Sequence, residues 1–340
     1  MRRALRTLGF LLWSAAWAVA RDQSVLRPVG PQAAKISHLW WAMLLVTTIT
    51  FVLVIAFLSR AVASKKSDEA TLLEPPLPMS PESESGLTRG VTIAVGLSVM
   101  ALFGLLVVSI MTERSVASLA SKNAVTIEVT GRQWWWQVRY DDPVPSQTVV
   151  TANEIHIPVG EPVVILTSSS DVIHSFWVPN IHGKRDLIPG YTNALWIQAD
   201  QPGTYRGQCA EFCGHQHAHM AFYVIAEPKD RYLAWLDAQR KPAADPDSDL
   251  KKRGRELFTS ATCNMCHTIR GTQSGAVTAP DLTHLASRNT IASGTLHLDH
   301  ENLKKWISDS QSVKPGTRMP AHQFSDQDMD ALLAYLESLR

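Results

Sequence analysis

The sequence predicts a membrane-anchored chain of several domains, with two transmembrane helices followed by a β-sandwich and then an all-α domain. Two long apolar runs without a charged residue, Leu39–Leu58 and Val91–Met111, lie in the first third of the chain. Short β-rich runs separated by Pro and Gly fill residues 123–228, which is typical of a sandwich. An amphipathic segment with helical periodicity, Ser325–Leu339, closes the chain.

Residues 1–20 have the layout of a cleaved secretory signal. Arg2, Arg3 and Arg6 precede an apolar core, and an Ala-Val-Ala sequence ends the segment, so we expect cleavage after Ala20. The alternative is an uncleaved membrane helix, for which the apolar run is short.

Residues 21–115 are predicted to form a two-helix anchor with spans at about 39–58 and 91–111. The connection between the spans carries four basic residues near the helix ends: Arg60, Lys65, Lys66 and Arg89. The positive-inside rule therefore places this connection in the cytoplasm and both long ends of the chain outside. Trp40 and Trp41 fit an aromatic belt at the outer interface.

The net charge of +1 gives no electrostatic basis for binding nucleic acid. Residues 123–228 contain ten acidic and five basic residues, so this part of the surface would steer a basic partner. The four cysteines form two close pairs, Cys209/Cys213 and Cys263/Cys266, which suits two prosthetic sites better than a disulfide framework.

The segment Cys209–Met220 is dense in ligands for a transition metal. It carries two thiols, three imidazoles, a thioether and a carboxylate, a set that copper suits best. The β-like flanks and Gly214 place it on a loop between two strands rather than on a helix. A disulfide would leave the His and Met positions unexplained, and a structural zinc site has no use for a thioether.

The spacing C-x-E-x-C-x3-H-x2-M resembles, at every position, the binuclear copper (CuA) loop of cytochrome c oxidase subunit II. The resemblance implies thiolates bridging two coppers, terminal His and Met ligands, and a backbone-carbonyl ligand; these are Cys209, Cys213, His217, Met220 and Glu211. It also implies a magnesium ion shared with the catalytic subunit through the Glu211 carboxylate. His215 and His219 fall outside the ligand positions and are expected to be solvated.

Two upstream segments extend the resemblance, which implies a cupredoxin-like fold. Ser170–Phe176 resembles the family segment D-V-x-H-S-F, so His174 is the implied second terminal histidine. The run from Gly131 contains three consecutive indoles, which cannot all be buried on a strand whose faces alternate, and we expect at least one to be exposed. The resemblance makes Trp134 the residue where electrons reach the copper.

A Pro- and Asp-rich linker, within residues 229–249, leads to a domain at 250–340. There Cys263, Cys266 and His267 form the C-x-x-C-H signal for covalent attachment of haem c. The surrounding sequence resembles class I cytochrome c, which implies Met319 as the sixth iron ligand and Pro280 as the acceptor of the proximal histidine's N–H. Four histidines are rival axial candidates: His284, His297, His300 and His322.

The resemblance covers residues 35–340 and implies subunit II of a caa-type cytochrome c oxidase, an oxidoreductase and translocase of the respiratory chain. It implies electron flow from a donor, a cytochrome c or a quinol-oxidising complex, through haem c and CuA. The electrons would then reach a haem–copper catalytic subunit I, where oxygen is reduced to water, because the chain carries no oxygen-reducing site of its own. Other oxidase subunits and membrane lipid are implied as further partners.

The implied location is the bacterial inner membrane, which the chain crosses more than once, with copper and haem domains on the periplasmic side. Two other functions remain open at the level of sequence. The chain could be the copper-containing subunit of a nitric oxide or nitrous oxide reductase, or a free-standing membrane-anchored electron carrier.

Overall fold

The computed structural model describes residues 23–64, 81–117 and 124–340. The expected signal segment, residues 1–20, and two of the basic residues used to orient the spans, Lys65 and Lys66, lie outside the described residues. The described chain separates into two compact units, residues 34–119 and the remainder.

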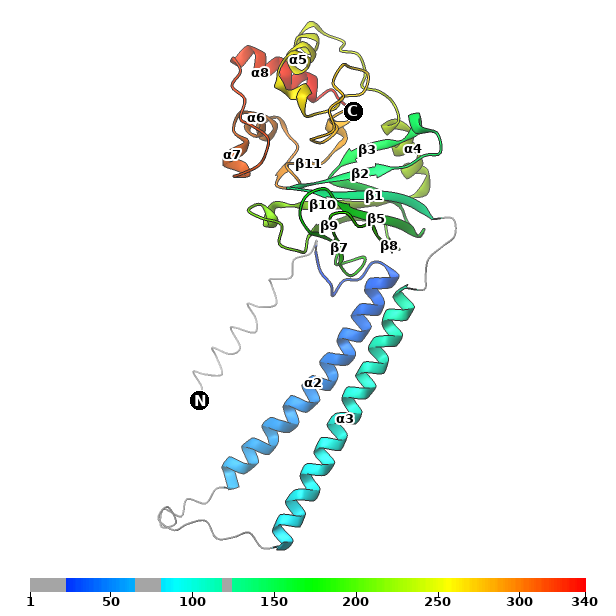
Figure 1. The fold of residues 1–340 in the computed structure, drawn as a ribbon, viewed down its shortest axis with the longest axis vertical. Helices are drawn as coiled ribbons and strands as arrows, with labels where there is room; N and C mark the ends of the chain where they lie inside the picture. The colour runs from blue at the N-terminus through cyan, green and yellow to red at the C-terminus, as the bar shows by residue number, and fades with distance from the viewer. Residues whose placement is uncertain (1–22, 65–80, 118–123) are drawn as a thin grey trace, which may run out of the picture. The chain divides into compact units, whose positions relative to one another are not determined.

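The smaller unit contains two long helices, α2 (Pro31–Ser64) and α3 (Pro81–Ala117) (Figure 1). Their most apolar windows have no buried share, so they are not core helices of a soluble domain. The start of α2 lies beside the end of α3, because Lys35 Nζ donates to the Ser115 carbonyl at 2.9 Å. This bond supplies a donor to a carbonyl at the open C-terminal end of α3. Both helices are long and apolar enough to cross a membrane, as predicted.

The larger unit begins with a two-sheet sandwich (Figure 1). One sheet has the order β3-β2-β1-β5-β8 and the other β4-β10-β9-β6-β7. The strands are β1 (Val125–Arg132), β2 (Trp135–Tyr140), β3 (Val149–Ala152), β4 (Glu154–Pro158), β5 (Val163–Ser169), β6 (His174–Trp177), β7 (Arg185–Leu187), β8 (Asn193–Ile197), β9 (Gly203–Cys209) and β10 (Ala221–Glu227). β1 pairs in parallel with β5, and β4 with β10, while the other pairs are antiparallel.

Burial alternates along β1 and β5, because successive side chains of a strand face opposite sides of the sheet. The inward-facing residues of both sheets form one apolar core that includes Trp136, Phe176 and Phe222. The sandwich fold class expected from the sequence is thus confirmed. β2 begins at the second residue of the indole run, which the sequence predicts to lie on a strand. β6 and β7 are only four and three residues long.

Helix α4 (Lys229–Gln239) follows β10 and packs on the sandwich. The Trp235 ring stacks on His156 with centroids 3.9 Å apart and an interplanar angle of 9°. Arg240, directly after the helix, forms an ion pair with Asp142 at 2.8 Å. The first half of the expected linker is therefore an ordered helix held against the copper-type domain.

The last part of the chain has its own apolar core, separate from that of the sandwich. Its helices are α5 (Asp249–Ser260), α6 (His300–Ser308), α7 (Ser310–Val313) and α8 (Asp326–Leu336), joined by short 3-10 turns and the two-residue strands β11 (Thr290–Ile291) and β12 (Leu296–His297). α5 and α8 cross closely at Gly254, where an added Cβ would lie 2.0 Å from the Ala331 carbonyl oxygen. Ser325 caps α8 by accepting from the Asp328 N–H.

Candidate metal and haem centres

The loop between β9 and β10 carries the predicted copper ligands. It is irregular except for one 3-10 turn, His217–His219, as expected for a loop rather than a helix. The Cys209 N–H donates to the Met220 carbonyl at 3.0 Å and closes the base of the loop. This closure brings both ends of the ligand segment to the same edge of the sheet.

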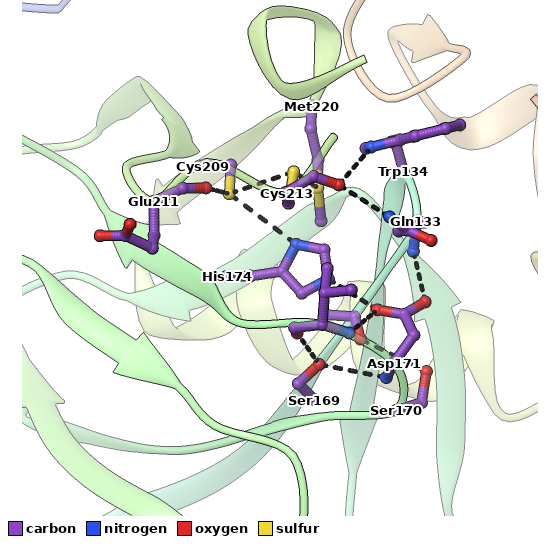
Figure 2. A network of polar contacts seen from close by, with 12 residues as sticks. Gln133, Trp134, Ser169, Ser170, Asp171, His174, Cys209, Glu211, Cys213 and Met220 are labelled. Carbon is purple, nitrogen blue, oxygen red and sulfur yellow. Dashed lines mark hydrogen bonds and ion pairs between the residues drawn. The ribbon is translucent and has the colours of Figure 1, made fainter. Parts of the chain in front are cut away.

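Five ligand side chains converge at this edge. Cys209 Sγ lies 3.8 Å from Cys213 Sγ and 3.8 Å from His174 Nδ1, as Figure 2 shows. Cys213 Sγ in turn lies 3.6 Å from His217 Nδ1 and 3.8 Å from Met220 Sδ. His174, Cys209, Cys213 and Met220 are buried, which protects their donor atoms from competing water.

The sulfur separation distinguishes a metal site from a disulfide. A disulfide bond is about 2.05 Å long, so the Cys209 and Cys213 thiols at 3.8 Å are not bonded. Thiolates bind metals at about 2.3 Å, so two sulfurs at this separation can share one ion between them. The donor set of two thiols, two imidazoles and one thioether therefore fits copper by both chemistry and spacing.

The backbone carbonyl and the side-chain carboxylate of Glu211 point in different directions. The carbonyl oxygen lies 3.1 Å from Cys209 Sγ, beside the thiol cluster, while the side chain is exposed and points away from it (Figure 2). His215 and His219 are also exposed, and the nearest polar partner of His219 is Gln216, at 2.9 Å. The two histidines outside the ligand pattern therefore take no part in the thiol cluster.

His174 is the first residue of β6 and is fixed at both ring nitrogens. Its Nε2 lies 2.9 Å from Asp171 Oδ1, which leaves Nδ1 facing Cys209. An added Cβ at Gly131 would lie 2.7 Å from the imidazole, so only glycine lets the ring lie against β1. Asp171 also accepts the Gln133 N–H at 2.7 Å and thus orients the ligand from outside the cluster.

Metal binding at this cluster would compete with protons for the same donor atoms. Burial lowers the pKa of His174, but its hydrogen bonds with Cys209 and Asp171 outweigh burial and raise it. Hydrogen bonding with Cys213 lowers the pKa of Cys209, and the same interaction raises that of Cys213. The thiol pair therefore loses its first proton readily and its second only with difficulty. A bound metal would have to displace this second proton.

The three indoles are less exposed than the sequence suggested, and that expectation was wrong. Trp134 and Trp136 are buried and Trp135 is half-buried. The reason is that Trp134 lies in the turn before β2, outside the alternation of the strand. Its indole N–H donates to the Cys213 carbonyl at 2.9 Å (Figure 2), and the Gly316 segment of the last domain lies against its ring.

The last domain contains a large cavity, of about 700 Å³, lined by the predicted haem-attachment residues Cys263, Cys266 and His267. His267 Nδ1 lies 2.7 Å from the Pro280 carbonyl, so the hydrogen bond expected for a proximal histidine is present. Burial lowers the pKa of His267, which keeps the imidazole neutral and able to bind a metal. The cavity and its donors fit a covalently attached haem.

The structure reduces the number of side chains that could serve as the sixth ligand of the haem iron. Met319 and His322 both line the cavity. His284 does not, because its Nε2 is bonded to the Lys241 carbonyl at 3.0 Å, and His300 pairs with Glu337 on the surface. His297 is exposed on β12.

One wall of the haem cavity comes from the sandwich. Trp134, Trp135 and Asp171 line it together with the helices of the last domain. Trp134 therefore borders the cavity and at the same time contacts the copper-type loop. No sequence pattern indicated this junction, because it depends on contacts between residues far apart in the chain.

A β-sandwich with a buried two-cysteine ligand loop, followed by a C-x-x-C-H domain, is the arrangement of a protein class with one candidate copper site and one candidate haem site. Residues 145–227 match the family "Cytochrome C oxidase subunit II, periplasmic domain", and residues 251–340 match "Cytochrome c". The sandwich is thus similar to the periplasmic domain of cytochrome c oxidase subunit II, and the last domain is similar to cytochrome c. The two families imply a CuA copper centre and a haem c.

Relatives agree with these matches. The chain is 43% identical to cytochrome c oxidase subunit 2 of Alkalihalophilus pseudofirmus over 64% of this chain and 62% of that protein. It is 35% identical to the same subunit of Bacillus sp. strain PS3 over 64% and 63%. The matches thus span less than two thirds of these relatives. The crystal structure of the periplasmic domain of subunit II of cytochrome oxidase from Bradyrhizobium japonicum is 28% identical, covering 36% of this chain and 97% of that one, with a TM-score of 0.34.

Proposed function

We propose that this chain is the electron-transfer subunit of a terminal haem–copper oxidase. It passes electrons from a donor through haem c and CuA to a catalytic subunit that reduces oxygen to water. One observation carries this proposal: Trp134 lines the haem cavity and donates a hydrogen bond to the Cys213 carbonyl, so the two candidate cofactor sites meet at one residue.

We propose that the copper centre is held by His174, Cys209, Glu211, Cys213, His217 and Met220, and the haem by Cys263, Cys266, His267 and Met319. When bound, the copper pair and the haem iron take up and release single electrons. Burial of the copper ligands excludes water, and the Asp171 contact fixes the orientation of His174. Ligands that barely move on a change of charge suit a relay.

We infer the domain arrangement from the same elements: a signal segment at 1–20, a membrane anchor at 21–115, a copper domain at 123–228, a linker at 229–249 and a cytochrome c domain at 250–340. The location proposed is the bacterial inner membrane, with copper and haem domains in the periplasm. The unburied apolar surfaces of α2 and α3 support contact with lipid, and the exposed Trp40 and Trp41 support an interfacial belt.

The first test is the cofactor content of the complex purified from membranes. We expect two coppers and one covalent haem for each chain, together with a haem–copper catalytic subunit I, other oxidase subunits and oxygen consumption. Zinc in place of copper would contradict the proposal. A partner that reduces nitrogen oxides, or the absence of any partner, would favour the two other functions considered from the sequence.

The second test distinguishes reduction of the haem by its donor from onward electron transfer through the copper centre. His217→Leu should leave the haem reducible by its donor while oxygen consumption collapses, because a terminal copper ligand is lost. His219→Leu, an exposed neighbour on the same 3-10 turn, is the matched control and should retain oxygen consumption. Rapid-mixing spectroscopy decides the question: if the His217 variant oxidises its haem at the wild-type rate, electrons do not pass through this site.

The third test concerns the sixth haem ligand. Met319→Leu should change the optical and magnetic spectra of the haem and lower its reduction potential, because a Met axial ligand raises that potential. His322→Leu, which removes the other candidate lining the cavity, should leave the spectra unchanged. The reverse pattern would assign the ligand to His322.

We also propose that the Glu211 carboxylate binds a magnesium ion shared with the catalytic subunit. The exposed side chain, directed away from the thiol cluster, supports this second role. Glu211→Gln should lower the magnesium content of the complex, whereas Glu161→Gln, another exposed carboxylate of the same domain, should not. An unchanged magnesium content in the Glu211 variant would show that the Glu211 carboxylate does not bind magnesium.

A further inference from the structure

Lys314 is a buried lysine between the cytochrome c domain and the copper domain. It follows α7, in the segment that leads to Met319, and its side chain is 2% exposed. Its Nζ donates to the Trp134 carbonyl at 2.8 Å and to the Ala292 carbonyl at 3.2 Å. A side chain of the cytochrome c domain thus holds the main chain of a copper-domain residue.

Trp134 is consequently held from two sides. Its carbonyl accepts from Lys314, while its indole N–H donates to the Cys213 carbonyl at 2.9 Å. The two bonds come from different domains, and the ring between them borders the haem cavity. A neighbouring bond, from Gln216 Nε2 to the Pro315 carbonyl at 2.8 Å, ties the copper loop to the residue after Lys314.

A lysine at this position is costly. Burial lowers its pKa to about 7, although the nearby Cys213 acts in the opposite direction. An apolar side chain of the same length would avoid this desolvation but would leave the Trp134 carbonyl without its donor. The benefit of the lysine therefore lies in the geometry that it imposes on Trp134.

We propose that Lys314 is a positioning residue for electron transfer from haem c to copper, because it holds Trp134 between the haem cavity and Cys213. The inference rests on the proposed function of the chain. In the transfer, the haem iron is oxidised by one electron and the copper centre is reduced by one, with no bond broken. Lys314 acts only through its hydrogen bonds to the Trp134 and Ala292 carbonyls.

The test uses the complete oxidase complex with Lys314→Met, which keeps the length of the side chain but removes the donor. Lys305→Met, which removes an exposed cation from the same domain, is the matched control. Hydroxyl-radical footprinting of Trp134, which is 8% exposed, measures its position without relying on activity. Haem-to-copper transfer is followed by rapid mixing, and copper reduction by a small reductant is followed separately.

We expect Lys314→Met to increase the labelling of Trp134 and to slow haem-to-copper transfer by about tenfold or more, as displaced transfer partners do. Direct reduction of copper by the small reductant should remain at the wild-type rate. Lys305→Met should match the wild type in every measurement. If Lys314→Met loses copper or haem, Lys314→Gln replaces it, because the amide retains a donor, and an intermediate rate is expected.

Two results would overturn the proposal. One is increased labelling of Trp134 with an unchanged transfer rate. The other is a slower rate fully explained by a change in midpoint potential, since loss of a cation near Cys213 also disfavours the reduced copper centre. Both potentials are therefore measured. Failure of the proposed function is distinguishable, because it would appear in the wild type as missing copper or missing oxygen consumption.

Discussion

Asp171 shows how a residue that touches no metal can control a metal ligand. Its carboxylate lies 2.9 Å from His174 Nε2 and accepts main-chain N–H groups from Gln133 and Val172. Burial raises the pKa of Asp171, but the hydrogen bonds with His174, Gln133 and Val172 outweigh it and lower the pKa. The carboxylate therefore stays charged and keeps Nδ1 of the imidazole directed at Cys209.

Asp171→Asn should weaken copper retention by about 10–100-fold, the usual cost of losing a carboxylate behind a ligating histidine. Asp141→Asn is the control, because that carboxylate forms an exposed ion pair with Arg139 on the same domain. Competition with a copper chelator measures retention in the purified complex. Equal retention in both variants would show that Asp171 does not orient the ligand.

At the scale of elements, the haem domain depends on the close crossing of α5 and α8. Gly254 lies at the crossing point, where the Ala331 carbonyl and the Tyr335 side chain leave no room for a Cβ. The two helices pack through Phe258 and Tyr335, whose rings meet edge to face with centroids 6.5 Å apart. Any side chain at Gly254 must push the helices apart.

Gly254→Ala should destabilise the cytochrome c domain by about 1–3 kcal/mol, as overpacking of a tight core does. Gly275→Ala is the matched control, since nothing lies within 4 Å of an added Cβ there. Thermal loss of the haem absorbance in the full-length chain reports the difference. Similar melting of the two variants would mean that the helices can separate without cost.

Within the sandwich, the neighbouring strands β4 and β10 are joined by a titratable side-chain contact. Glu227 lies 2.9 Å from His156 Nδ1, and this hydrogen bond, opposed by burial, lowers the pKa of Glu227 below its ordinary value of 4.5. The folded state therefore binds fewer protons than the unfolded state near that pH. The stabilisation is fully present above pH 4.5 and is lost as pH falls through the lower, folded-state pKa.

Glu227→Gln should lower stability by about 1 kcal/mol at neutral pH, and the difference from the wild type should shrink below pH 4.5. Glu161→Gln, which breaks an exposed pair with Lys229, should have a smaller effect. Melting temperatures of the full-length chain across this pH range test the sign. A difference that grows towards acid pH would contradict it.

At the scale of the whole molecule, the haem domain contacts the copper domain through buried hydrogen bonds as well as through the linker. Asn289 N–H donates to the buried Glu154 carboxylate at 2.8 Å, and Ser293 exchanges two hydrogen bonds with Ala221. The linker end is also fixed, because the Ala243 N–H donates to the Arg270 carbonyl. The haem domain thus packs against the copper domain in addition to being connected to it by the linker.

Because these contacts are buried, haem-to-copper transfer should change little between low and high salt. Reduction of the haem by an external protein donor depends on exposed charges and should vary with salt. Rapid mixing over a range of ionic strengths compares the two steps in one preparation. A strong salt dependence of haem-to-copper transfer would mean that the haem domain dissociates from the copper domain during turnover.

Features encoded within short segments could be predicted from residue types and their spacing. The apolar spans, the ligand loop Cys209–Met220 and the C-x-x-C-H attachment motif are local, so residue type and spacing suffice to predict them. Most strands of the sandwich followed from their alternation and turns. β6 and β7 did not, because their sequences, His-Ser-Phe-Trp and Arg-Asp-Leu, have neither β-branched residues nor an alternation of polar and apolar residues.

Contacts between residues far apart in the chain became visible only in the folded structure. The fold buries Trp134 against the thiol loop and places Lys314 on a carbonyl 180 positions earlier in the chain. It also reduced the candidates for the sixth haem ligand to Met319 and His322. Local sequence encodes the chemistry of each donor, whereas the packing of the two domains fixes how the donors face one another, because those contacts join residues with no common periodicity.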